Sequence, residues 1–255
     1  MGSVSLSRRD DGVSVLTLDG AIDLAWAEQL AQHATALRVD STVRAVLIRS
    51  DGRLFCPGGD LQWMADQPDA AKALALLAGT LHAALLELAA MEAPVVASVH
   101  GPAAGAGFSL VMAADMAIAG ASATFTMAYT GVGLSPDGGS SWLLPRIVGR
   151  RRAADLMLTS RSVSADEAER IGLVTRAGAD DELGSETEAL LARLATGPTA
   201  SFGVIKRLLD RSSQSEFADQ LAAEAAAISR IAATPAGREG VAAFLEKRRP
   251  DFSGR

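Results

Sequence analysis

Asp137 is the residue of this sequence whose type and setting most directly suggest chemistry. It lies in the stretch GLSPDGGSSWLLPR, residues 133–146, and no other acidic residue occurs between Met116 and Asp155. A carboxylate among apolar side chains can exchange a proton near neutral pH, because burial disfavours its charged form. The alternative is a turn residue that caps the following helix, since Pro-Asp-Gly is ordinary turn chemistry.

Two glycine-containing stretches could supply main-chain hydrogen-bond donors. GPAAGAG begins at Gly101 after an apolar segment, and CPGGD ends at Asp60, where a short helix is expected to start. We expect another helix from Ala106, whose free N–H groups would suit a developing oxyanion. A dinucleotide fingerprint is disfavoured because Leu110 takes the place of its third glycine. From spacing alone, both stretches could equally be close-packed turns.

The remaining reactive side chains lack the spacing that their usual chemistry requires. No neighbour in the sequence would activate Cys56, so packing or contact with an acyl group is expected. His33, His82 and His100 have no metal-ligand spacing, and no metal site is expected.

Composition narrows the class of protein and its partners. Hydrophobic residues make up 49% of the 255 residues, charged residues make up 21%, and the net charge is -6. This balance argues against nucleic acid or an anionic membrane as the main partner. A single cysteine rules out an internal disulfide, so a reduced, cytoplasmic protein is expected. We also expect no membrane segment.

The framework that must position these residues is a repeated order of strand, strand and helix, which indicates an α/β fold. β-branched runs separated by a turn predict an N-terminal hairpin. From about residue 138 onward, the pattern is almost wholly helical. The expected strands are 4–10, 13–19, 43–50, 93–101, 115–119 and 123–127, and the expected helices before residue 138 include 24–38 and 68–92.

Three stretches resemble the enoyl-CoA hydratase/isomerase (crotonase) family. They are FCPGGDL at 55–61, SVHGPAAGAGFSLVMAADMAIA at 98–119, and the ending FLEKRRPDFSGR. The resemblance implies a crotonase-like core of repeated ββα units in a spiral, with an acyl-CoA site, over residues 1–195. It also implies a helical C-terminal oligomerisation region over residues 196–255, in a homotrimer or hexamer. Coenzyme A would enter as part of an acyl-CoA thioester substrate, with no covalently bound cofactor.

The same resemblance assigns site residues. The two main-chain donors for a thioester carbonyl fall on Gly59 and Ala106, and Arg53, Lys247 and Arg248 are candidates for the coenzyme A phosphates. The substrate-binding residues implied are Ala21, Cys56, Gly58, Asp60, Leu61, Trp63, Gly105, Ser109, Tyr129, Leu134 and Lys247.

The reaction depends on the acid and base groups. Family members that resemble hydratases carry two glutamates, at places that Ser109 and Tyr129 fill here, and no glutamate lies between Glu92 and Glu167. Neither hydroxyl can replace a carboxylate base near neutral pH without strong activation. The sequence therefore resembles isomerase-like members with an aspartate in the Pro-Asp-Gly-Gly loop, with Asp137 moving a proton to shift a double bond.

Three alternatives to an isomerase stay open. The chain could be a non-catalytic acyl-CoA binder, a hydrolase or dehalogenase with Asp137 as nucleophile, or a hydratase by family label only. An aromatic content of 4% makes a ring clamp for an aromatic dehalogenase substrate less favoured. The apolar residues expected around the carboxylate are Val132, Leu134 and Trp142.

Overall fold

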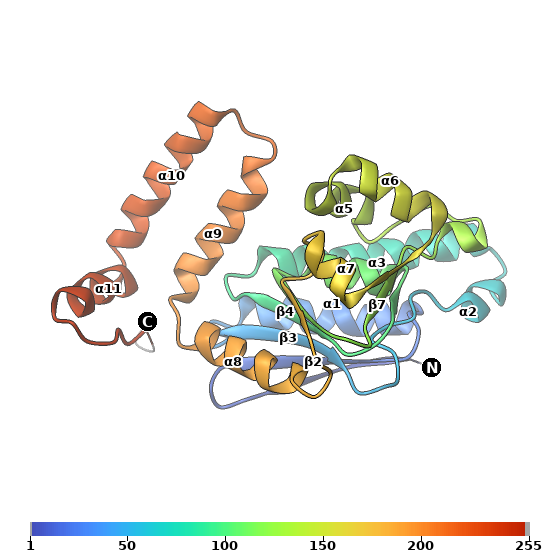
Figure 1. Cartoon of the computed structure of the whole chain (residues 1–255), viewed down its shortest axis with the longest axis horizontal. Coiled ribbons are helices and arrows are strands. Elements are labelled where there is room, and N and C mark those ends of the chain that lie inside the picture. Colours follow the sequence, from blue (N-terminus) through green and yellow to red (C-terminus); the bar gives the residue numbers. More distant parts are fainter. Residues whose placement is uncertain (1, 253–255) are drawn as a thin grey trace.

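The main sheet has six strands in the order β1-β2-β3-β4-β6-β9 (Figure 1). The computed structural model describes residues 2–252. β1 and β2 form the expected antiparallel hairpin, and every further pairing in this sheet is parallel. The strands are β1 (Ser3–Arg8), β2 (Val13–Asp19), β3 (Ala45–Ser50), β4 (Val95–Val99), β6 (Met116–Gly120) and β9 (Arg176–Gly178).

Both faces of this sheet are covered by helices. Successive side chains of a strand point to opposite faces, so each strand contributes to two core clusters. Leu16 and Ile48 belong to the larger core cluster, which includes residues of α1 (Leu24–Val39) and α3 (Ala70–Ala90). Leu47 packs on the other side with Leu191 of α8 (Leu183–Ala195). The apolar strand sequences therefore read as continuous hydrophobic runs, as is typical of parallel sheets.

Helix α3 is the one helix of the described chain that is long and apolar enough to cross a membrane by length and composition. The sequence predicts no membrane segment, whereas this helix meets the length and composition criterion for one. One side of α3 packs into the core through Leu77, Leu81, Ala84 and Leu88. The core helix of a globular protein passes the same test, so length and hydropathy alone do not distinguish the two.

A second, three-stranded sheet lies beside the segments that carry the glycines. Its order is β5-β7-β8. An isolated bridge between Cys56 and Ala103 ties the CPGGD segment to this sheet, and β5 leads directly into α4. The elements are β5 (Ala103–Ala104), β7 (Thr124–Thr126), β8 (Ser162–Ser164) and α4 (Ala106–Ala113).

The expectation of an almost wholly helical chain after residue 138 is wrong at two places. β8 pairs antiparallel with β7, and β9 pairs parallel with β6. Both strands have three residues, too few for an alternating pattern to appear, and only the neighbouring strand makes them extended. The helices between and before them are α5 (Ser140–Val148), α6 (Arg150–Thr159) and α7 (Ala165–Arg170).

Three C-terminal helices extend away from the sheet (Figure 1). They are α9 (Thr199–Ser212), α10 (Phe217–Ala232) and α11 (Pro235–Leu245). Lys206 of α9 is buried and its Nζ lies 2.8 Å from Asp115 Oδ2, at the foot of β6. Burial raises the pKa of Asp115 even though Lys206 opposes the shift. We call α9, α10 and α11 the C-terminal arm. This ion pair links the start of the arm to the core.

Candidate active site

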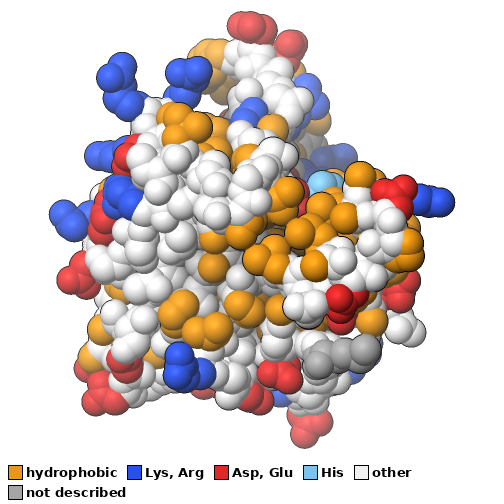
Figure 2. All heavy atoms as spheres, turned by 90° about the vertical axis from the view of Figure 1, so that its right-hand side faces the viewer, with side chains coloured by type: hydrophobic (Ala, Val, Ile, Leu, Met, Phe, Trp, Pro, Cys, Tyr) orange, Lys and Arg blue, Asp and Glu red, His pale blue; other side chains and the backbone are white. Residues whose placement is uncertain are grey.

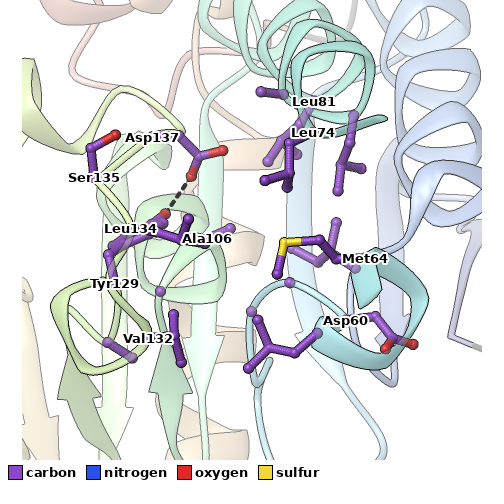
Figure 3. Close-up of a pocket in the computed structure, with 18 of the residues that line it drawn as sticks. Asp60, Met64, Leu74, Leu81, Ala106, Tyr129, Val132, Leu134, Ser135 and Asp137 are labelled. Atoms are coloured by element: carbon purple, nitrogen blue, oxygen red, sulfur yellow. Dashed lines mark hydrogen bonds between the residues drawn. The ribbon is translucent and has the colours of Figure 1, made fainter. Parts of the chain in front are cut away.

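A cavity of about 340 Å³ lies between the CPGGD segment, α3, the start of α4 and the loop that carries Asp137. Hydrophobic side chains gather on the face of the molecule where α2 (Leu61–Ala65) lies (Figure 2). The cavity walls come from segments that are far apart in the sequence (Figure 3). Its lining includes Ile22, Gly58, Gly59, Asp60, Leu61, Met64, Leu74, Leu77, Leu81, Gly105, Ala106, Tyr129, Val132, Leu134, Ser135 and Asp137.

Gly59 lines this cavity, and its N–H points away from the bridge that its neighbours make to Ile22. Ile22 N donates to Gly58 O at 2.8 Å, and Asp60 N donates to Ile22 O at 2.9 Å. In such a parallel bridge, the residue between the two bonded neighbours points its own N–H to the opposite side. Over residues 2–252, the Gly59 N–H has no hydrogen-bond acceptor.

The second donor belongs to the first residue of α4. The helix begins at Ala106, as expected, and the N–H groups of a first helical turn have no partner within the helix. Ala106 N lies close to Gly58 of the CPGGD segment. If Gly58 carried a Cβ, that atom would be only 3.4 Å from Ala106 N. Two main-chain donors thus line one cavity, and donors placed in this way can stabilise negative charge on an oxygen.

Two glycines allow the donor segments to approach so closely. Gly58 has φ +93°, and a Cβ there would lie 2.7 Å from Ala104 O. A Cβ on Gly107 would lie 2.3 Å from Cys56 O, and Ala104 N donates to that same oxygen at 2.9 Å. Main chain therefore packs directly on main chain, and any side chain at either glycine would separate the two segments.

Asp137 lines the same cavity, beside Tyr129 (Figure 3), and its side chain does not cap α5. The N-cap residue of α5 is Gly139, which makes no side-chain cap bond. Asp137 Oδ1 instead accepts a hydrogen bond of 2.5 Å from the hydroxyl group of Tyr129 (Figure 3). The alternative interpretation as a capping aspartate is therefore wrong, and the carboxylate is directed toward the cavity.

Ser109 and Tyr129, the two residues at the glutamate places, meet each other beside Asp137. Ser109 is fully buried, and its Oγ lies 3.3 Å from the Tyr129 hydroxyl oxygen and donates to Asp137 O at 3.2 Å. Burial and the charge of Asp137 raise the pKa of Tyr129 above its ordinary value, so the phenol is a neutral donor.

Six of the residues predicted to bind substrate line the cavity. Gly58, Asp60, Leu61, Gly105, Tyr129 and Leu134 line it, although the Asp60 carboxylate also caps α2 by accepting from Trp63 N at 2.9 Å. Val132 lines it as well, whereas Trp142 stands outside it under the Arg146 guanidinium, 3.9 Å from the ring centroid.

Five residues assigned to substrate binding lie outside the lining. Cys56 is buried in the core, and burial raises the pKa of its thiol to about 11, so packing is its role. Trp63 packs against the core, Ser109 lies behind the wall, and Ala21 precedes the lining residue Ile22. Lys247 follows α11 and is not part of the lining.

His82 contributes to the site without having been predicted to do so. Its Nε2 accepts a hydrogen bond of 3.0 Å from Gly138 N, the residue after Asp137. Gly138 has φ +60°, and a Cβ there would lie 2.7 Å from Ser109 Cβ. Helix α3 and helix α4 therefore both hold the loop that carries the carboxylate. Nothing in the sequence around His82 signals this long-range contact.

Comparison with known proteins shows the family to which this chain belongs. The model of the family described as enoyl-CoA hydratase/isomerase matches residues 9–255. A Rhodobacter capsulatus protein named "Probable enoyl-CoA hydratase" is 38% identical over 253 residues, which cover 96% of each chain. The 1,2-epoxyphenylacetyl-CoA isomerase of Escherichia coli K12 is 36% identical over 258 residues, covering 98% of each chain.

A solved structure agrees with these relatives. The crystal structure of an enoyl-CoA hydratase from Polaromonas sp. JS666 superposes with a TM-score of 0.92 at 32% identity, covering 98% of this chain and 99% of that chain. Fold and cavity together define an α/β protein of the crotonase type, which confirms the predicted fold class. The chain belongs to the enoyl-CoA hydratase/isomerase family, whose members act on acyl-CoA thioesters.

Proposed function

We propose that this protein is an acyl-CoA isomerase that shifts a double bond, with Asp137 as acid and base. The observation that carries the proposal is that one carboxylate lines the same cavity as two residues whose main-chain N–H groups have no acceptor within the described residues. Asp137, Gly59 and Ala106 line the same cavity. The other lining carboxylate, Asp60, caps α2 through its Oδ1. The similarity to the E. coli 1,2-epoxyphenylacetyl-CoA isomerase supports isomerisation of an acyl-CoA as the general type of reaction.

The chemistry follows from these groups for a 3-enoyl thioester. Asp137 takes a proton from C2, and the electron pair moves into a dienolate whose negative charge resides on the thioester oxygen. Hydrogen bonds from the N–H groups of Gly59 and Ala106 stabilise that oxygen in a partly dry site. The protonated Asp137 then returns the proton to C4, and the double bond lies between C2 and C3. Atoms and charge balance without any further reactant.

Hydration is disfavoured because it needs a group that holds and deprotonates water. Ser109 and Tyr129 offer hydroxyl groups in place of the hydratase glutamates, and both are already hydrogen-bonded within the site. A neutral hydroxyl is a poor base near neutral pH. Asp137 is then the one carboxylate of the described lining that does not cap a helix.

The lining also supports a class of acyl group. Leu61, Met64, Leu74, Leu77 and Leu81 form one apolar side of the cavity, and no Lys or Arg belongs to the described lining. A carboxylate at the end of an acyl chain would be buried there without a counter-charge, which is costly. We therefore propose an uncharged, predominantly aliphatic acyl chain.

An assay with defined thioesters tests reaction type. The unmodified protein is expected to convert trans-3-octenoyl-CoA to the conjugated 2-enoyl isomer, and to hydrate trans-2-octenoyl-CoA at a negligible rate. Absorbance of the conjugated thioester follows both reactions. Rapid loss of that absorbance from trans-2-octenoyl-CoA would identify a hydratase instead. Tight binding of octanoyl-CoA with neither reaction would identify a non-catalytic binder.

We also propose that the C-terminal arm joins subunits. Phe217, Ile228 and Phe244 of α10 and α11 are 77%, 72% and 83% exposed, and Leu221, Val241 and Leu245 of the same helices are exposed as well; grouped exposed apolar side chains are typical of an interface. Burial in a closed, symmetric assembly would cover them. Sedimentation analysis at micromolar concentration is expected to give a trimer or hexamer, and Ile228→Asp is expected to shift it toward smaller species. A stable monomer of the unmodified chain would contradict the proposal.

A further inference from the structure

The hydroxyl group of Tyr129 occupies one oxygen of the candidate catalytic carboxylate and leaves the other free. It donates to Asp137 Oδ1 at 2.5 Å. The second oxygen points away from Tyr129, toward the side of the cavity formed by Leu74 and Leu81 (Figure 3). The two oxygens of Asp137 are therefore different in environment, since one is held by the protein and one faces the acyl site.

Further contacts fix the geometry of this pair. Ser109 Oγ lies 3.3 Å from the Tyr129 hydroxyl oxygen, and the main-chain oxygen of Asp137 accepts from both Ser109 Oγ and Ser140 Oγ. His82 accepts from the next N–H along the loop. The carboxylate cannot turn freely, because its main chain is held on both sides and its Oδ1 is held by the phenol.

We propose that Tyr129 is a positioning residue for Asp137, which by binding Oδ1 assigns both proton transfers to Oδ2. The inference rests on the proposed isomerase function. The proton removed from C2 is carried on Oδ2 and returned from the same atom to C4, while the phenol keeps its own proton throughout. A neutral donor to Oδ1 also stabilises the charged carboxylate that must act as base in the first step.

Kinetics of Tyr129→Phe test this role. The variant is expected to lose about 10- to 100-fold in kcat for trans-3-octenoyl-CoA, because a misplaced catalytic group is that costly. The KM and the dissociation constant for octanoyl-CoA should change less than about twofold, since the ring is kept. The same change in an Asp137→Asn background should cause almost no further loss, because the two residues act as one unit. If the loss in kcat of the double variant equals the product of the two single losses, the residues act independently and the inference is overturned.

A spectroscopic measurement tests the contact without any reaction. Tyr129 is the only tyrosine of the chain, so protein with tyrosine labelled by ¹³C at Cζ gives a single side-chain resonance. That resonance is expected to move as the unmodified protein is acidified and Asp137 takes up a proton. It should stay nearly constant in Asp137→Asn. The other titratable groups near the pair, His82 and Asp60, are present in both proteins, so the comparison isolates Asp137.

The outcomes separate this inference from the proposed function. Identical resonances and identical titrations in the two proteins would show that Tyr129 does not sense the carboxylate, and would overturn the inference. A coupled resonance in a protein that shifts no double bond would leave the contact standing and reject the isomerase proposal.

Discussion

Asp137→Asn should lower the rate of double-bond shift in trans-3-octenoyl-CoA by about 10²–10⁴, the usual loss for a general acid or base. The amide has nearly the same shape as the carboxylate, and its oxygen can still accept the hydrogen bond from Tyr129. It cannot take a proton from C2. The loss should therefore appear in kcat, measured by the absorbance of the conjugated product under saturating substrate.

Two controls make this result specific. Calorimetry should give nearly the same dissociation constant for octanoyl-CoA in both proteins, and thermal unfolding should give nearly the same Tm. Asp69→Asn makes the same chemical change at a residue outside the cavity, where asparagine also caps α3 well. If Asp137→Asn keeps its isomerase activity, Asp137 is not the acid and base.

Gly59→Pro is expected to lower kcat by about 10²–10³, which is the cost of one lost oxyanion donor. Proline removes the Gly59 N–H, which is the proposed donor. The neighbouring bonds to Ile22 use the Gly58 carbonyl and the Asp60 N–H, so they do not depend on the Gly59 N–H. Single-turnover measurement with trans-3-octenoyl-CoA would separate this loss from slower product release.

Gly59→Ala is the matched control, because it adds a side chain but keeps the N–H. A Cβ on Gly59 meets no atom within 4 Å, so the alanine variant should fold and keep most of its activity. Ala106→Pro removes the second donor at the first position of α4, where proline is tolerated in helices. Full activity in a correctly folded Gly59→Pro protein would falsify the assignment of this donor.

Local signals predicted those parts of the site that depend on main chain. The glycines of CPGGD and GPAAGAG indicated two tight segments before helices, and α2 and α4 begin where expected, at Leu61 and Ala106. The isolation of Asp137 between distant acidic residues indicated a special carboxylate, and it does line the cavity. Turn chemistry and helix starts are determined by neighbours in the sequence, so they can be read from it.

Contacts between distant segments could not be predicted in this way. Tyr129 and Ser109 were recognised as replacements for glutamates, but their common contact with Asp137 appears only when α4 and the loop after β7 are packed together. Cys56 lies beside the donor Gly59 in sequence, yet its side chain points into the core. His82 is 56 residues from its partner Gly138. Each depends on tertiary packing, which local patterns do not encode.

The direct packing of main chain on main chain at Gly58 and Gly107 has a consequence for how such a protein can evolve. The spacing between the two donor segments is set by glycines and carbonyl oxygens, so it is insensitive to the side chains around the cavity. If the proposed function holds, substitutions at Ser109, Tyr129 or Asp137 change the proton chemistry and leave the proposed hydrogen bonds to a thioester oxygen in place. The proposal thus separates a main-chain part of the site, fixed by glycines, from a side-chain part that can be exchanged, and relatives named as a hydratase and as an isomerase match nearly the whole chain.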